Sequence, residues 1–312
     1  MIATVTLNPS LDEWIHLPSL RLGGLNRATA FRRYPGGKGI NVSRVIHELG
    51  GKTTAFALAG GEDGLILRKL MNRLSIRHDF VEVSGLTRNN YKILTAHPHA
   101  FTEVNAPGPT VSGASLAALR QRIVALRPAP RCVVLSGSLP PGAPDSTYQQ
   151  WIRALQRRGI PSVLDTSGAA LQQGLRGRPW LIKPNREEAE QLLQRRLTRL
   201  TTHIHAVQQL LQRGPTLVIL SLGGDGALMG SDAPRWVWLA RPPSVKVDSA
   251  VGAGDSLVGG FLVGWVGGQT LVESLRLGMA CGTATAMTPG TELCHRSDVR
   301  RLLRRVTITR VA

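Results

Sequence analysis

The residue types with the most obvious chemical use gather late in the chain, in the segment Asp248–Asp255. Its last four residues, Gly252-Ala253-Gly254-Asp255, lead straight into a stretch with helical character. Small residues at a helix start let backbone N–H groups point at an anion, and the positive end of the helix adds to the attraction. Asp255 in the first turn can then accept a proton from a hydroxyl that attacks a phosphoryl group held there. The alternative is a plain helix cap, because Asp is common at helix starts.

A second cluster of small residues lies near the N-terminus, where Gly36, Gly37 and Gly39 surround Lys38 in a loop that enters a predicted helix. Glycine loses much conformational entropy on folding, so this density indicates that something must come close to the backbone here. With a lysine in its centre, the loop favours a sugar that carries its own phosphate.

Two shorter segments follow predicted strands. The glycine-rich segment Ser221–Gly226 either lets a nucleotide approach the backbone or forms a hairpin turn. The segment Lys183–Glu188 places Asn185 and Glu188 three residues apart, on one face of a first helical turn. That pair suits Mg²⁺-bound phosphate held through water, and it suits a capping box equally well.

These segments need a scaffold, and the chain alternates predicted strands with predicted helices. Strands are expected over residues 1–7, 53–58, 132–135, 161–164 and 217–220. Helices are expected over residues 40–49, 64–74, 115–126, 147–157, 187–195 and 202–212, and then over 255–268, 271–287 and 297–305 with no strand between them. Such alternation predicts an α/β fold with a mainly parallel sheet covered on both faces.

Residues 14–33 and 92–105 break this alternation, because they carry short alternating segments without a helical pattern. We expect them to form a small β lid that projects from the edge of the sheet, and not an independently folding domain.

The composition bears on the partners of the protein. The 312 residues include 38 Lys and Arg against 20 Asp and Glu, a formal net charge of +18, which by itself would suit nucleic acid. Only six of the basic residues are lysines, the arginines are scattered along the chain, and aromatic residues make up 4%, too few for a base-stacking surface. We therefore expect no specific nucleic-acid partner and interpret the arginines mostly as solvated helix faces.

Other features bear on the environment of the protein. The N-terminal Met1–Val5 predicts a strand, not a signal peptide, and the longest apolar run, residues 257–268, is shorter than the about 20 residues of a membrane span. Three scattered cysteines fit a reducing environment, so we expect a cytoplasmic protein with no membrane partner. A complete Walker P-loop is absent. Paired metal-ligand spacing is also absent among His97, His99, His203, His205, Cys294 and His295.

Taken in their order along the chain, these motifs resemble those of the ribokinase-like sugar kinases of the phosphofructokinase B type. The resemblance extends over nearly the whole chain, from Thr4–Asp12 to Gly290–Glu292. Its most specific signatures are the early Gly36–Val42 and the late Asp248–Asp255.

Within this family, three segments look most like bacterial 1-phosphofructokinases, and tagatose-6-phosphate kinases are similar too. These segments are Gly23–Arg27, Tyr34–Ser43 and Thr102–Pro109. The segment Gly290–Cys294 instead resembles the minor bacterial 6-phosphofructokinase.

The resemblance implies a three-layer α/β/α ribokinase-like fold in a single kinase domain over residues 1–312, with lid segments at 11–34 and 90–106. It also implies a homodimer formed through the lid. The implied reaction transfers the γ-phosphoryl group of ATP to a ketohexose phosphate, above all to fructose 1-phosphate, which gives fructose 1,6-bisphosphate. A 6-phosphofructokinase and a tagatose-6-phosphate kinase are the alternatives.

The resemblance assigns roles to individual residues as well. Asp255 is expected to be the catalytic base, and the amides of Gly252, Ala253 and Gly254 are expected to stabilise the transferring group. The sugar and its phosphate are expected to contact Asp12, Arg27, Gly36, Gly37, Lys38, Asn41, Arg88 and Ser138. The nucleotide is expected to contact Lys183, Asn185, Glu188, Ser221, Gly223, Gly224, Asp225, Gly226 and Gly254.

The implied cofactors are ATP and Mg²⁺, with Glu188 near the metal through water and K⁺ as a further candidate ion. Ala250 departs from the family pattern, because a hydroxyl residue often stands two positions before the first glycine of the anion hole. That departure affects one nucleotide or K⁺ contact and leaves the carboxylate of Asp255 in place.

Overall fold

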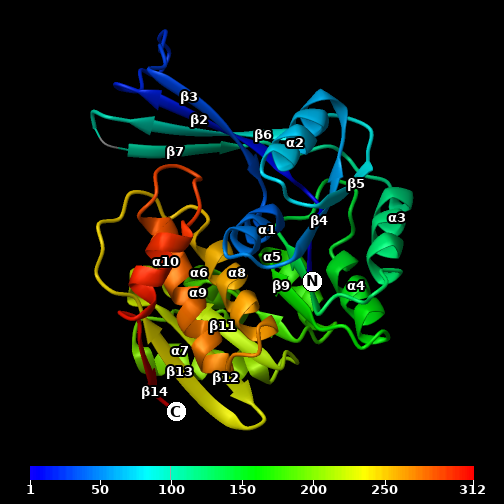
Figure 1. Ribbon diagram of the computed structural model, residues 1–312, viewed down its shortest axis with the longest axis vertical. Helices are drawn as coiled ribbons and strands as arrows, with labels where there is room; N and C mark the ends of the chain where they lie inside the picture. The colour runs from blue at the N-terminus through cyan, green and yellow to red at the C-terminus, as the bar shows by residue number, and fades with distance from the viewer. Residues whose placement is uncertain (99) are drawn as a thin grey trace.

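A ten-stranded sheet forms the centre of the molecule (Figure 1), in a computed structural model that describes residues 1–98 and 100–312. The strands follow the order β14-β13-β12-β11-β10-β9-β8-β1-β4-β5. Seven neighbours run parallel: β1 (Ile2–Thr6), β4 (Thr53–Ala59), β5 (His78–Glu82), β8 (Cys132–Ser136), β9 (Ser162–Asp165), β10 (Leu181–Ile182) and β11 (Leu217–Ser221). Three more extend one edge in antiparallel fashion: β12 (Ala227–Asp232), β13 (Arg235–Arg241) and β14 (Thr307–Arg310).

Helices cover both faces of this sheet. One face packs against α3 (Gly113–Val124), α4 (Thr147–Gln156), α5 (Gly168–Leu175), α6 (Arg186–Leu193) and α7 (Leu200–Leu211). The other packs against α1 (Lys38–Glu48), α2 (Gly61–Arg73), α8 (Ala253–Val266), α9 (Leu271–Ala286) and α10 (Arg296–Leu303). Strand β1 divides its side chains between the two cores, with Val5 in the first and Ile2 in the second, as a strand buried on both faces must.

A separate four-stranded sheet, which we call the lid, extends away from the main body (Figure 1). It has the order β3-β2-β6-β7 and consists of β3 (Ala30–Gly36), β2 (Ser10–Leu17), β6 (Arg88–Thr95) and β7 (Ala100–Asn105). In its register, Asp12 stands beside Asn90, and Asn90 stands beside Asn105. Neighbouring residues in register share a face, so one face of the lid carries a polar row.

The predicted α/β fold, with a mainly parallel sheet covered on both faces and a small β lid, is confirmed. The three C-terminal helices follow one another with no strand between them, as predicted, and β14, which the sequence did not predict, follows α10. This edge strand has four residues, with Ile308 partly buried between exposed threonines, which is too short a pattern to stand out from the preceding helix. The hairpin β12–β13 was also not predicted.

His99, which falls in the predicted lid segment, lies outside the described residues. Within residues 1–98 and 100–312, every helix is too short or too polar to cross a membrane.

Candidate active site

A cavity of about 1040 Å³ opens between the lid and the carboxyl ends of the parallel strands. Several of the residues that line it directly follow or end these strands: Asn8 after β1, Ser138 after β8, Ser167 after β9, Lys183 and Asn185 after β10, and Ser221 at the end of β11. Ligands of open α/β sheets bind at this edge, where loops leave the strands and helix N-termini face outward. The cavity is therefore the candidate active site.

The residues of the predicted anion hole lie at the start of α8. Gly252 is its N-cap residue, in the left-handed region at φ 79° and ψ −5°, which glycine adopts without strain. A Cβ at this position would also lie 2.6 Å from Leu293 Cδ2. Gly254 lies close to a cation, because a Cβ there would stand 3.3 Å from Lys183 Nζ. Backbone N–H groups, a helix N-terminus and an ammonium thus converge on one point of the cavity.

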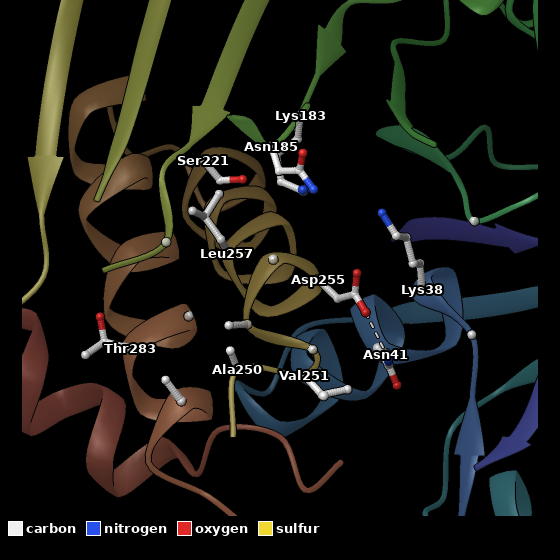
Figure 2. A pocket seen from close by; sticks show the side chains of 18 of the residues that line it. Lys38, Asn41, Lys183, Asn185, Ser221, Ala250, Val251, Asp255, Leu257 and Thr283 are labelled. Atoms are coloured by element: carbon white, nitrogen blue, oxygen red, sulfur yellow. Dashed lines mark hydrogen bonds between the residues drawn. The ribbon is translucent and has the colours of Figure 1, made fainter. Parts of the chain in front are cut away.

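Asp255 lies in the first turn of α8 and is 6% exposed. Its Oδ2 accepts a hydrogen bond of 2.8 Å from Asn41 Nδ2 of α1, and Figure 2 shows the two side chains pointing toward each other. Burial raises the pKa of the Asp255 carboxyl to about 6, with a further rise from Asp165, whereas Lys38, the bond from Asn41 and Lys183 lower it. The group is thus ionised near neutral pH yet able to take up a proton, as a general base requires.

Asp165, at the end of β9, forms a buried ion pair with two lysines. Its Oδ1 lies 2.9 Å from Lys38 Nζ and 3.4 Å from Lys183 Nζ. Burial alone would raise the pKa of Asp165, but Lys183 and Lys38 together hold it below its ordinary value. Burial alone would likewise lower the pKa of Lys38, but Asp165 and Asp255 raise it above its ordinary range. Lys38 is therefore cationic beside the start of α8.

The N-terminal glycine loop presses the start of α1 against β1 and the lid. Gly37, the N-cap residue, has φ 110°, and a Cβ there would lie 2.6 Å from Thr6 Cγ2. A Cβ on Gly36 would stand 2.4 Å from Asp12 Oδ1. The predicted close approach is confirmed here, but the closest groups are protein atoms. The glycines let Lys38 and Asn41 reach the cavity from α1.

The lid contributes a polar face to the same cavity. Asp12 Oδ1 accepts hydrogen bonds from Ser10 Oγ at 2.9 Å and Asn90 Nδ2 at 3.4 Å. One step further along the lid, Lys92 Nζ donates to Glu103 Oε1 over 2.8 Å. These groups line the cavity opposite the strand ends and suit a ligand rich in hydroxyl groups.

Arg88, the first residue of β6, lines the cavity while its two terminal nitrogens hold the protein backbone. Nη1 donates to Ala106 O and Nη2 to Asn8 O, each over 3.0 Å, whereas the buried Nε has no hydrogen-bond partner among residues 1–98 and 100–312. Burial lowers the pKa of the guanidinium despite the nearby Asp12. Arg88 thus brings one fixed positive charge to the base of the lid.

The opposite part of the cavity lies between the β11–β12 turn, the 242–251 segment and α9. Ser221 and Asn185 face it from the strand ends, and Ala250, Val251 and Thr283 also line the cavity (Figure 2). The segment Ser221–Gly226 was left open between a hairpin turn and a nucleotide contact. It forms the turn of an antiparallel hairpin, and Ser221, Gly223, Gly224 and Gly226 also line the cavity.

The Asn185–Glu188 pair forms the capping box that the sequence allowed. Asn185 Oδ1 accepts from Glu188 N at 2.8 Å, and Glu188 Oε2 accepts from Asn185 N at 2.9 Å. Asn185 still lines the cavity, but Glu188 does not. The carboxylate of Glu188 nevertheless contributes to the raised pKa of Lys38, so its charge reaches the site.

Most of the predicted site residues come together around this one cavity. The lining includes Asp12, Gly37, Lys38, Asn41, Arg88, Ser138, Lys183, Asn185, Ser221, Gly223, Gly224, Gly226, Gly252, Ala253, Gly254 and Asp255.

Four predicted residues do not line the cavity. Arg27 is exposed in the connection between β2 and β3, which lies at the lid and away from the strand ends. Asp225 is exposed and pairs with Arg186 over 2.8 Å. Gly36 packs against the side chain of Asp12. Glu188 forms the capping box at the start of α6.

Several residues of the site were not predicted from the sequence. The clearest is Asp165, which is fully buried behind the cavity lining and pairs with Lys38 and Lys183, although an acidic residue directly after a buried apolar strand was a usable signal. Lys92 and Glu103 fell inside the predicted lid, but their facing positions depend on the register between β6 and β7. Pro242, Val247 and Thr283 also line the cavity, but they belong to no motif that marks them as site residues in the sequence.

Comparison with known proteins places this site in context. Residues 5–298 match the model of the pfkB family of carbohydrate kinases. The chain is similar to the 1-phosphofructokinase of Bacillus subtilis (strain 168), with 37% identity over 311 residues and 100% of each chain covered. It is also 36% identical over 303 residues to the ATP-dependent 6-phosphofructokinase isozyme 2 of Escherichia coli (strain K12), with 96% and 97% covered. The crystal structure of Phosphofructokinase-2 from Escherichia coli in complex with potassium is similar, with a TM-score of 0.92 and 35% identity over 97% of this chain and 98% of that chain.

Proposed function

The chain belongs to the pfkB family of carbohydrate kinases, as its motifs predicted, and on this premise we propose that it transfers the γ-phosphoryl group of ATP to a ketohexose phosphate. The preferred acceptor is fructose 1-phosphate, which becomes fructose 1,6-bisphosphate. The observation that carries the proposal is the buried carboxylate of Asp255, placed beside the anion hole of α8 in a cavity that also reaches the polar face of the lid.

The transfer needs a base for the attacking hydroxyl and donors for the moving phosphoryl group. Asp255 takes the proton of the hydroxyl as its oxygen attacks the γ-phosphorus, and the bond from that phosphorus to the β-phosphate oxygen breaks, so that ADP leaves. The N–H groups of Gly252, Ala253 and Gly254 bind the phosphoryl oxygens during transfer. The ammonium of Lys183 adds positive charge at the same point. Lys38, which is held in place by its bond to Asp165, adds a second positive charge near the phosphoryl group.

The acceptor sugar lies under the lid. Asp12, Gly37 and Asn41 bind its hydroxyl groups, and Arg88 with Ser138 binds its phosphate, for which a guanidinium is a strong partner. The lid cation Lys92, which the motifs did not single out, faces the same space. A neutral sugar would not need this concentration of cations.

The residues beside the anion hole fit Mg²⁺, which prefers oxygen ligands and usually retains several waters. Asn185 lines the cavity, and the carboxylate of Glu188, three residues further on, is near enough to affect the pKa of Lys38. Glu188 would hold the metal through water. Bound there, Mg²⁺ neutralises charge on the phosphates of ATP. For K⁺ the fit is poorer, because Ala250 offers no side-chain oxygen, so a K⁺ site would depend on backbone carbonyls.

The decisive experiment compares kcat/KM for fructose 1-phosphate, fructose 6-phosphate and tagatose 6-phosphate at saturating MgATP. We expect the highest value for fructose 1-phosphate. A higher value for fructose 6-phosphate or tagatose 6-phosphate would assign one of the alternative activities. Absence of phosphoryl transfer to all three would overturn the proposed substrate class.

A homodimer through the lid is the second part of the proposal. Three large side chains on the lid face opposite Asp12 remain exposed: Phe31 at 55%, Tyr91 at 43% and Val104 at 53%. A second copy of this chain would cover such an apolar face, and Arg27 could then approach the partner's cavity. Sedimentation of the parent and of Phe31→Asp tests this, since the charge should shift the dimer toward monomer. A monomeric parent would contradict it.

A further inference from the structure

Arg44 is a partly buried arginine of α1 that stands just outside the cavity, one turn after Asn41. Its Nη1 donates to Asn41 Oδ1 over 3.2 Å and to Pro35 O of lid strand β3 over 3.4 Å. Its Nη2 donates to Thr291 O, in the loop after α9, over 3.3 Å. One guanidinium thus joins the lid, the start of α1 and the C-terminal loop.

The bond to Asn41 decides which way that side chain faces. An Asn amide has an oxygen that accepts and an NH₂ that donates, whereas a guanidinium only donates. The end of Asn41 that faces Arg44 must therefore be the oxygen. The NH₂ end is turned to Asp255, whose Oδ2 lies 2.8 Å away (Figure 2). A reversed amide would set an oxygen against the carboxylate of Asp255 and an NH₂ against the guanidinium of Arg44.

The orientation matters because the Asn41 bond acts on the form of Asp255 that accepts a proton. A hydrogen bond donated to a carboxylate favours its ionised form, whereas burial favours the neutral form. The other groups that influence Asp255 are Lys38 of α1, Asp165 at the end of β9 and Lys183 after β10. None of these three can reverse the Asn41 amide.

We propose that Arg44 is a positioning residue for phosphoryl transfer, which holds Asn41 Oδ1 and so keeps the Asn41 amide donating to Asp255. The inference rests on the proposed role of Asp255 as the base. Arginine suits the position because its planar fork reaches the carbonyls of Pro35 and Thr291 together with Asn41. The ionic surroundings of the guanidinium are Asp12, Tyr34, Glu292 and Asp255.

The first test is the pH dependence of kcat in Arg44→Met and Arg44→Lys. Arg44→Met should lower kcat by about 10- to 100-fold, as misplacement of a catalytic group does, with the KM for ATP nearly unchanged. Its acid limb should move to higher pH by about one unit, because Asp255 loses a donor to its charged form. Arg44→Lys retains a donor for Asn41 and should keep the acid limb of the parent. Arg68→Met is the matched control, because Arg68 holds Phe80 O and Glu82 away from the cavity.

The second test is a double-mutant cycle with Asn41→Ala. If Arg44 acts through the amide, Arg44→Met should cause no further shift of the acid limb in the Asn41→Ala background. An unchanged acid limb in Arg44→Met, or an equal fall in kcat in both backgrounds, would overturn the proposal and leave Arg44 as an anchor of lid and loop.

A third measurement separates this inference from the proposed function. The ¹³C carboxyl signal of Asp255, assigned with Asp255→Asn, reports its titration midpoint without any turnover. We expect a higher midpoint in folded Arg44→Met than in the parent, and a parent-like midpoint in Arg44→Lys. Equal midpoints in all three would reject the role of Arg44 whether or not Asp255 is the base. Full activity of Asp255→Asn would reject only the proposed function.

Discussion

The two walls of the cavity are built in different ways. The wall at the strand ends consists of buried charges that come from α1, α8 and the ends of β9 and β10, with Asp165 wholly enclosed between Lys38 and Lys183. The lid wall consists of strand side chains on a sheet whose other face is open, and its cations are already bonded: Lys92 to Glu103 and Arg88 to backbone carbonyls.

This difference separates two tasks. The buried wall holds its charges in one arrangement because the surrounding sheet leaves little room for change, which suits a transfer step that needs fixed electrostatics. The lid wall offers partners that a substrate can share or replace, which suits selection among sugar phosphates. Changes in the buried wall should therefore alter turnover or stability, and changes in the lid should alter substrate binding.

The largest effect is expected from Asp255→Asn. Loss of the base should lower kcat by about 10²- to 10⁴-fold, while KM for the sugar phosphate and for ATP stay close to those of the parent, since size and hydrogen-bonding shape are preserved. Steady-state kinetics with each substrate varied measures this. Turnover equal to that of the parent would remove Asp255 from the mechanism.

The next effect concerns stability and contrasts a buried ion pair with a surface one. Asp165→Ala leaves Lys38 and Lys183 without their shared carboxylate, and breaking a buried pair in this way costs about 3–5 kcal/mol. Asp79→Ala is the matched control, because the Asp79–Arg122 pair has side chains 42% and 48% exposed, and such pairs contribute at most about 1 kcal/mol. Urea denaturation at neutral pH gives both values. Equal losses in the free energy of unfolding of the two variants would show that burial does not strengthen the Asp165 ion pair.

A smaller effect separates two cations that the sequence assigned together to the sugar phosphate. Arg88→Ala on the lid should raise KM for the sugar phosphate about 10- to 100-fold, the equivalent of roughly 1.4–2.8 kcal/mol, with little change in kcat. Lys38→Ala in the buried wall should instead act mainly on kcat. Kinetics with both substrates varied distinguishes the two. If Arg88→Ala changed kcat alone, the division of tasks between the walls would fail.

The smallest effect is a pH-dependent gain of stability in Asp255→Asn. Because the folded pKa of Asp255 is raised from 3.8 to about 6, its ionisation penalises the folded state above the unfolded pKa. The Asn variant should therefore be more stable than the parent at pH 8, and the difference should vanish below about pH 4. Denaturation curves at the two pH values test the sign. An Asn variant that is no more stable than the parent at pH 8 would contradict the prediction.

The two walls also differed in how far the sequence predicted them. The anion hole and Asp255 are contiguous, so spacing alone indicated their chemistry. Asp165 acts through Lys38, 127 residues away, and a contact at that distance leaves no local pattern. Arg27 and Asp225 were predicted by family position, yet both are exposed in the chain described here. Strand register, which the sequence leaves open, decides which lid residues face the sugar.

The strand order has a consequence for how the chain assembles during synthesis. Strand β1 is made first, yet its neighbours in the sheet are β4 and β8, and β8 ends only at Ser136. The nascent chain must therefore keep an apolar strand unpaired on one side until β8 has left the ribosome. Lys38 can pair with Asp165 only later, because Asp165 follows β8 in the sequence. Such late, non-local pairing slows folding and exposes strand edges to aggregation, so this protein is expected to depend on chaperones more than a protein with local contacts.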